Sequence, residues 1–412
     1  MGEIVKKYYE RIHFILIGLL VLFPITPRGI QSSLIITLFV VSLVHFFLEG
    51  ITHWTRNKTI LLISLGSISI IYIISLFHST SVNEGVKFVI RLSPTLLIAF
   101  TFLTQKSFRW EYHKLQVVLY LYTASLLLFL IYLHISTFEI IANKNLSSWH
   151  LRDRIDQLTE VHGTYLSIWI GFAIVCGFWF VIKNINKKIF LIANVVIICY
   201  FFYWIYLIGA RMPILATIVS LGWLLLDLWK VSNKTKIFAV GSLICICVTV
   251  FWNPILNKVN EMRNYENAIP EGKYENTNPL ISNENIRSVI YHCALKKIEE
   301  RPILGYGIGR VNSELQECYD EEFNHTDLFT RFKFNAHSQY LQLVLTLGIF
   351  GITLFVTSII CWFRSSSLKL YHYFLALILL SFAFENVLNR HDGIIFFSVF
   401  NAILLMSKKN QV

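Results

Sequence analysis

One histidine stands where its side chain could act as an acid or a base. His337 opens a long apolar segment, in the run Asn335-Ala336-His337-Ser338-Gln339. The N-terminal end of a helix opposes protonation of a nearby imidazole, and a neutral imidazole can serve as a general base near neutral pH. The same position also suits a histidine that only caps the helix. Position alone leaves both interpretations open.

Two arginines are placed where a guanidinium group could bind an anion. Arg211 lies between two apolar segments with almost no loop, within residues 208–213. This is a costly position unless the side chain reaches the interface or an anion, although a snorkelling arginine at a helix end is the alternative. Arg287 borders the apolar stripe of a predicted helix that Asn283 is expected to cap. Alternatively, Arg287 is a solvated arginine on the surface of that helix.

Lys87 and Arg91 are two further candidate cations. They are four residues apart, so they share one face of a predicted spanning helix. Arg91 lies about one turn deeper than Lys87, and an arginine within the membrane is a functional candidate by default. The alternative for Arg91 is an ion pair with a buried acid such as Glu385.

The cysteines and histidines do not predict a metal site. No Cys-x-x-Cys pair and no histidine cluster has the spacing of metal ligands, and no cofactor is predicted. Cys293 and Cys318 share one hydrophilic segment and could form a disulfide on an oxidising side of the membrane. Sequence alone cannot decide this pairing, because a disulfide requires a specific geometry.

A glycine-rich run lies in the same hydrophilic segment. Gly305-Tyr306-Gly307-Ile308-Gly309 lacks the strand–turn–helix context and the spacing of a nucleotide-binding loop. We interpret it as a tight turn that lets backbone approach backbone.

These residues must be positioned by a bundle of membrane-spanning helices. The chain has 412 residues, of which 55% are hydrophobic and 15% are charged, whereas a soluble protein carries about 25% charged residues. This composition excludes the soluble enzyme classes. A spanning helix needs about 20 apolar residues, and twelve such stretches are predicted, at 12–26, 32–49, 59–77, 86–104, 115–134, 162–182, 188–208, 212–229, 236–252, 338–362, 369–388 and 392–406. The predicted fold class is an all-α integral membrane protein with about 12 transmembrane helices.

The loop charges predict the orientation of the chain. Alternate loops and both termini carry 18 lysines and arginines, whereas the short loops of the other side carry six. The positive-inside rule therefore places both termini in the cytoplasm. Most of the net charge of +11 is explained by this topology, so nucleic acid is not indicated as a partner.

This topology divides the chain into three parts. Residues 1–252 hold helices 1–9, residues 253–336 form a loop domain with short helices on the outer face, and residues 337–412 hold helices 10–12. The loop domain contains 10 lysines and arginines and 13 acidic residues. The candidate cations and His337 all lie on this outer side.

The pattern as a whole resembles the O-antigen ligase family. His337-Ser338, nine residues, and Gly348-Ile349-Phe350-Gly351 match the family's His-[Ser/Asn/Gln]-nine-Gly-x-x-Gly signature. Residues 301–307 are similar to the Pro-x-x-Gly-x-Gly stretch that members carry before the histidine. Arg211 and Arg287 are similar to the family's two essential arginines, Arg287 by context more than by a strict motif. Twelve spans with a large periplasmic loop between helices 9 and 10 also fit this GT-C-like architecture.

The resemblance implies a glycosyltransferase that works without a metal ion and inverts the anomeric centre. The donor would be a polysaccharide on undecaprenyl pyrophosphate, and the acceptor a lipid A–core sugar, at the periplasmic face of the bacterial inner membrane. In these roles His337 is the general base. Arg211 and Arg287 stabilise the pyrophosphate, and Arg91 and Lys87 are additional candidates for that role. Gly348 and Gly351 would allow the close helix packing that fixes His337. Membrane lipids are the remaining partners.

Other functions fit part of the same pattern. An O-antigen or capsule polymerase uses the same donor with a different lipid-linked glycan as acceptor, and the sequence does not separate it from a ligase. A protein O-oligosaccharyltransferase fits less well, because those enzymes commonly carry extra C-terminal mass. A flippase for lipid-linked glycans also suits twelve spans. However, transporters tend to have repeated halves with polar residues at the midplane, and no such repeat is seen here.

Overall fold

The computed structural model describes residues 2–50, 54–104, 110–143, 148–183, 187–230, 241, 283–323 and 327–407. These residues confirm the predicted all-α membrane class, because they form helices and contain no strand. The α-helices are α1 (Gly2–Leu20), α2 (Arg28–His45), α3 (Arg56–Leu65), α4 (Ser67–Leu76), α5 (Val82–Leu103), α6 (Tyr112–Ser136), α7 (Phe138–Ala142), α8 (Ser148–Thr159), α9 (Gly163–Lys183), α10 (Lys188–Ile208), α11 (Arg211–Lys230), α14 (Asn283–Glu300), α15 (Val311–Glu322), α16 (Asp327–Phe332), α17 (Gln339–Ser365), α18 (Lys369–Phe384) and α19 (His391–Leu405).

The described helices account for ten of the twelve predicted spans. The first predicted span, 12–26, overlaps α1, which ends at Leu20 and is not among the helices long and apolar enough to cross a membrane. Seven of them are long and apolar enough to cross a membrane, and the pair α3 and α4, bent by 71°, would make an eighth. The helices α18 and α19 are shorter but also apolar. Apart from residue 241, the predicted ninth span, 236–252, lies outside the described residues, as do residues 253–282 at the start of the predicted loop domain.

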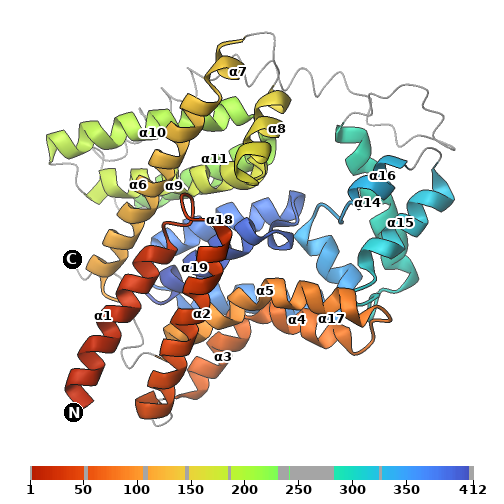
Figure 1. The fold of residues 1–412 in the computed structure, drawn as a ribbon, viewed down its shortest axis with the longest axis horizontal. Coiled ribbons are helices and arrows are strands. Elements are labelled where there is room, and N and C mark those ends of the chain that lie inside the picture. Colours follow the sequence, from red (N-terminus) through yellow and green to blue (C-terminus); the bar gives the residue numbers. More distant parts are fainter. Residues whose placement is uncertain are drawn as a thin grey trace.

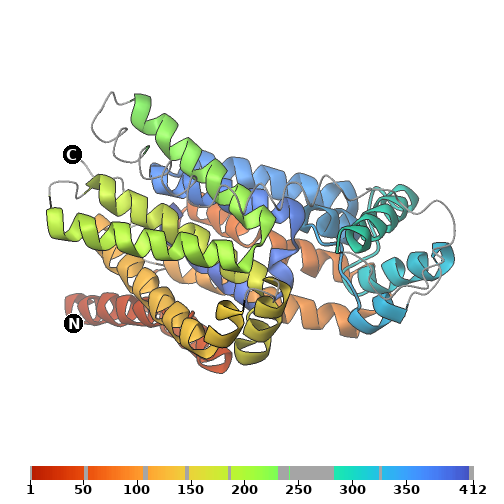
Figure 2. The ribbon, with the colours of Figure 1, turned by 90° about the horizontal axis from the view of Figure 1, so that it is seen from above.

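The short polar helices gather at one end of the molecule. Figures 1 and 2 both show α14, α15 and α16 together at one end of the long axis, whereas α1 begins at the opposite end. We call α14–α16, residues 283–332, the cap. In Figure 2 most long apolar helices run along this axis, so one end of the bundle carries the cap.

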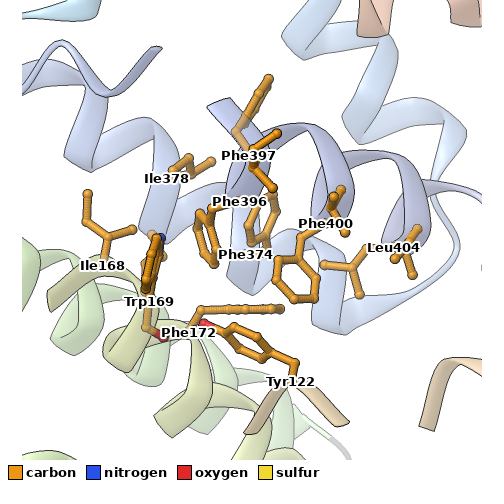
Figure 3. Packing of buried hydrophobic residues seen from close by; sticks show 14 of the residues in the cluster. Tyr122, Ile168, Trp169, Phe172, Phe374, Ile378, Phe396, Phe397, Phe400 and Leu404 are labelled. Carbon is orange, nitrogen blue, oxygen red and sulfur yellow. Dashed lines mark hydrogen bonds between the residues drawn. The ribbon is translucent and has the colours of Figure 1, made fainter. Parts of the chain in front are cut away.

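The helix α9 forms the centre of the bundle. Its apolar window is completely buried, unlike that of any other candidate span among the described residues, and it contacts α6, α10, α11, α18 and α19. Figure 3 shows the aromatic packing between α6, α9, α18 and α19. The ring centroids of Tyr122 and Phe172 lie 4.6 Å and 4.8 Å, respectively, from the ring centroid of Phe400. Small residues allow neighbouring helices to approach closely, and a Cβ at Gly171 would lie 2.3 Å from Thr217 Oγ1.

The helix α17 is broken where the glycine-rich turn packs against it. Leu347 and Gly348 have non-helical backbone angles, with φ of 59° at Gly348. The carbonyl groups freed near this break accept from the turn: Tyr306 N donates to Leu345 O at 2.7 Å, and Gly307 N donates to Thr346 O at 3.0 Å. The run 305–309 is therefore a tight turn whose backbone contacts the backbone of α17. This contact fixes the part of α17 that follows His337 in the chain.

Replacing Gly348 by alanine is expected to lower the free energy of unfolding by about 3 kcal/mol or more. The new Cβ would lie 2.1 Å from Ile303 O, and the positive φ disfavours any side chain. Thermal melting of the detergent-solubilised protein measures this loss. The matched control is Gly222→Ala in α11, where a Cβ meets nothing within 4 Å. Equal melting temperatures for the two variants would show that the break does not require glycine.

A separate hydrophobic cluster joins the cap to the start of α17. It contains Val289, Ile290 and Ala294 of α14, Val311 and Leu315 of α15, and Ala336 and Leu345 beside or within α17. Cys293 and Cys318 form a disulfide inside this cluster, which settles the pairing that the sequence left open. Beside it, Glu322 contacts Lys296 at 2.6 Å and also His292. The hydrogen bond from Lys296 lowers the pKa of Glu322.

Removing the disulfide, by replacing both Cys293 and Cys318 with serine, is expected to destabilise the cap by about 3 kcal/mol. The bond closes a loop with a sequence separation of 25, which restricts the unfolded chain. Protease cleavage within α14 and α15 should become faster, whereas replacing the free Cys199 with serine should leave it unchanged. Alkylation of both cysteines in denatured, unreduced wild-type protein would show instead that the bond does not form.

Candidate functional site

The carboxylate of Glu385 brings two of the predicted site residues together. Glu385 follows the last residue of α18 and is 8% exposed. Its Oε1 lies 3.6 Å from His337 Nδ1, and its Oε2 lies 3.6 Å from Arg287 Nη2. The acid therefore lies between the histidine at the start of α17 and the arginine in the first turns of α14. Both distances are longer than a hydrogen bond but short enough for strong electrostatic attraction at a buried site.

Residues 385–390, which connect α18 to α19 and which we call the Glu385 linker, are held by several helices. Tyr165 of α9 donates to the carbonyl oxygen of Asn386 at 3.1 Å. The side chain of Gln339, the first residue of α17, accepts from Leu388 N at 3.0 Å. Directly after the linker, Arg28 of α2 binds the buried Asp392 in the first turn of α19 at 2.8 Å. Because these contacts come from three separate helices, the position of Glu385 is fixed relative to the whole bundle.

His337 has an unusual backbone conformation and a directed ring. Its φ is 44°, in the left-handed region that non-glycine residues rarely adopt. Its ring Nδ1 is buried and has no hydrogen-bond partner, and Glu385 Oε1 lies 3.6 Å from it. The side chain as a whole is 22% exposed. The ring is therefore directed toward the acid through Nδ1 and remains accessible elsewhere.

A second histidine lies near the same carboxylate. His162 precedes α9, and its Nδ1 accepts from Thr164 N at 3.4 Å. Burial lowers the pKa of His162, and the negative charge of Glu385 partly offsets this effect. The positive charges of Arg390 and Arg152 lower the pKa of His162 further. The surroundings of Glu385 thus contain both imidazole and guanidinium groups.

Arg91 lies on the same linker, whereas Lys87 lies farther out. Arg91 Nη1 donates to the carbonyl oxygen of Asn389 at 2.9 Å, so the linker rather than Glu385 is its hydrogen-bond acceptor. Lys87 forms an exposed ion pair with Glu84 at 2.7 Å. Of these two cations, Arg91 is thus the one that the structure places beside the Glu385 linker.

The packing of α11 against α18 places Arg211 at the same end of the bundle. The two helices are antiparallel: Ser220 Oγ donates to Tyr373 O at 2.8 Å, and Lys369 Nζ lies 3.4 Å from Asp227 Oδ2. From Ser220 back to Arg211 is nine residues, and an equal length of α18 leads from Tyr373 to its last turn. Arg211 therefore lies at about the level of Glu385. The left-handed Gly209, with φ of 61°, makes the tight turn before it.

The two signature glycines act at different contacts. Gly348 lies at the break in α17 and packs on the backbone of residues 303–304. A Cβ at Gly351 would lie 3.5 Å from Ile71 of α4, so Gly351 lies where two helices approach. Both positions are in the helix that begins two residues after His337.

The described residues offer one cluster of potential metal ligands, and it does not fit a metal ion. The cluster consists of Cys293, Cys318 and Glu322. The two cysteines form a disulfide, so they supply no thiolate. The charged groups around Glu385 are instead imidazole and guanidinium groups, a set suited to binding anions and transferring protons.

Sequence reasoning missed the central acid and two of its neighbours. Glu385 was considered only as a partner for Arg91, although an acid within an apolar segment is a functional candidate by default. His162 stands at the edge of a predicted span and carried no distinguishing motif. Tyr291, which donates to His337 O at 3.3 Å, lies on the predicted helix of Arg287, but nothing in the spacing connected it with the histidine.

The comparison with protein families supports the resemblance seen in the sequence. Residues 196–356 match the family model described as O-antigen ligase. The matched region runs from the middle of α10 past the break in α17, so it includes Arg211, Arg287, His337, Gly348 and Gly351. Glu385 and Arg91 lie outside it. A search of curated proteins returned no match.

Proposed function

We propose, from the match of residues 196–356 to the O-antigen ligase family model, that the protein transfers a polysaccharide from undecaprenyl pyrophosphate to a lipid A–core sugar. The family implies glycan transfer by a ligase or a polymerase. The observation that carries the proposal is the convergence of His337 and Arg287 on Glu385 at one end of the bundle. A general base and a fixed cation are the two groups that this reaction requires.

The proton chemistry follows from the position of the histidine. The hydroxyl group of the acceptor sugar attacks the anomeric carbon and gives its proton to Nε2 of His337, because Nδ1 is buried against Glu385. The carboxylate favours the tautomer with the proton on Nδ1 and stabilises the imidazolium that forms. The 3.6 Å separation is compatible with this role, because catalytic hydrogen bonds are often long before substrate binds.

The arginines stabilise the leaving group. As the anomeric carbon–oxygen bond breaks, its electron pair passes to the pyrophosphate, and negative charge develops there. Arg287 and Arg211 supply guanidinium groups that bind phosphate oxygens in bidentate geometry, so the positive charge comes from the protein and no metal ion is required. Attack from the side opposite the pyrophosphate inverts the anomeric centre. Arg91 is a further cation for this group, and Lys87 lies nearer the edge of the site.

The proposed orientation places the cap in the periplasm. The chain is a multi-pass membrane protein, and we propose the inner membrane of a bacterium, with both termini in the cytoplasm. The excess of lysines and arginines in alternate loops supports this orientation. The disulfide between Cys293 and Cys318 is also consistent with an oxidising compartment around the cap.

Complementation in two hosts tests the proposal. One host lacks its own ligase and the other lacks its own polymerase, and both carry the matching glycan pathway. We expect the protein to restore the lipopolysaccharide ladder in the first host and to reduce its pool of undecaprenyl-linked polysaccharide. Restoration only in the second host, which otherwise attaches a single repeat unit to its core, would identify a polymerase. Failure in both hosts, with altered sidedness of the lipid-linked pool, would identify a flippase.

A further inference from the structure

The backbone of His337 is held in a conformation that it would not adopt unaided. Its φ of 44° makes it one of three non-glycine residues with positive φ in the described ranges, the others being Glu160 and Lys333. Such conformations persist only where surrounding contacts determine them, and they concentrate at functional sites. The contacts that hold His337 therefore decide where its ring points.

Two hydrogen bonds hold the peptide groups on either side of His337. On the N-terminal side, His337 N donates to Asn335 Oδ1 at 2.9 Å. On the C-terminal side, the hydroxyl group of Tyr291 donates to His337 O at 3.3 Å. The first bond is local, because Asn335 is two residues away. The second comes from the cap, 46 residues earlier in the chain, and so sets His337 relative to another element.

Tyr291 also connects the histidine with the arginine. It follows Arg287 by four residues on α14, so the two side chains project from the same face of the helix. The disulfide at Cys293 and the hydrophobic cluster around it, against which Tyr291 also packs, fasten α14 to α15. Burial raises the pKa of Tyr291, so its hydroxyl group stays protonated and able to donate. One helix thus presents a cation to Glu385 and a hydrogen bond to His337.

We propose that Tyr291 is a positioning residue for glycan transfer. Its hydroxyl group holds the main-chain carbonyl of His337 in the left-handed conformation, and this directs the imidazole Nδ1 toward Glu385. The hydrogen bond thereby couples the placement of the base to the placement of Arg287 on the same helix. The inference deepens the proposed function and rests on it.

The test is the isosteric change Tyr291→Phe, which removes only the hydroxyl group. We expect kcat for transfer by the purified protein to fall about 10-fold, the factor that corresponds to the loss of one hydrogen bond. The donor KM should not change, because Tyr291 is not proposed to touch the donor. The matched control is Tyr306→Phe, which removes another hydroxyl group beside the cap, one that donates to Glu300 at 2.8 Å; it should keep the wild-type kcat. An unchanged kcat for Tyr291→Phe, or an equal loss in the control, would overturn the proposal.

A second readout does not depend on the reaction. Carbethoxylation of His337 by diethylpyrocarbonate, followed by mass spectrometry, reports how freely the ring moves. We expect modification of His337 in Tyr291→Phe to be several-fold faster than in the wild type or in Tyr306→Phe. If the wild-type protein transfers no glycan, the proposed function fails and this rate alone decides the positioning role. An unchanged rate would then overturn it.

Discussion

Replacing His337 by alanine is expected to reduce the rate of glycan transfer by about 10²- to 10⁴-fold, the usual contribution of a general base. Without the imidazole, the acceptor hydroxyl must lose its proton to water while it attacks. Glu385 is only 8% exposed and lies on the Nδ1 side of the histidine, so it does not take over that proton directly. The measurement is the initial rate of polymer attachment in proteoliposomes that contain purified protein, donor and acceptor.

The matched control for this change is His292→Ala. His292 also pairs with a carboxylate, but its partner is Glu322, which lies beside the disulfide. This control should keep most of the activity, so a loss confined to His337→Ala cannot be attributed to the removal of any histidine–carboxylate pair. If His337→Ala transfers glycan at more than half the wild-type rate, the assignment of the general base is wrong.

Most of the membrane-spanning helices could be predicted because composition reports them directly. A spanning segment must be apolar along its whole length, so the boundaries of α5, α10 and α11 differ from the predicted spans by only a few residues. The bend between α3 and α4, by contrast, was not predicted, because residues 59–77 carry no charge and are apolar enough to form one continuous span. The structure places Gly66 at this bend, where a Cβ would collide with Leu96 of α5.

The candidate site could be predicted only in part, because its parts meet through tertiary packing. The signature pointed to His337 and Arg287 through their sequence context. Their meeting at Glu385 depends on the break in α17, on the cap and on the linker after α18, none of which leaves a periodic pattern. Gly348 illustrates the difference: a glycine one turn before another glycine suggested helix packing, whereas its positive φ breaks the helix.

Replacing Glu385 by glutamine is expected to lower the rate of transfer on the order of 10²-fold or more, although glutamine has nearly the same shape. The change removes the negative charge that favours the Nδ1–H tautomer of His337 and stabilises its imidazolium form. It also leaves Arg287 without the carboxylate that lies 3.6 Å from its guanidinium group, so the cation is no longer held in place for the pyrophosphate. Glu385→Asp keeps the charge but shortens its reach, and an intermediate rate is expected.

Two comparisons separate this role from a general loss of stability. The control is Glu321→Gln, which removes an exposed acid from the surface of the cap and should leave the rate unchanged. The decisive comparison is the pair of changes together: if Glu385 acts mainly through the histidine, Glu385→Gln should cost far less in protein that already carries His337→Ala. A loss that stays the same in both backgrounds would mean that the carboxylate acts through Arg287 rather than through the base. A fully active Glu385→Gln variant would remove the acid from the mechanism, because an amide cannot replace a charge that stabilises the imidazolium.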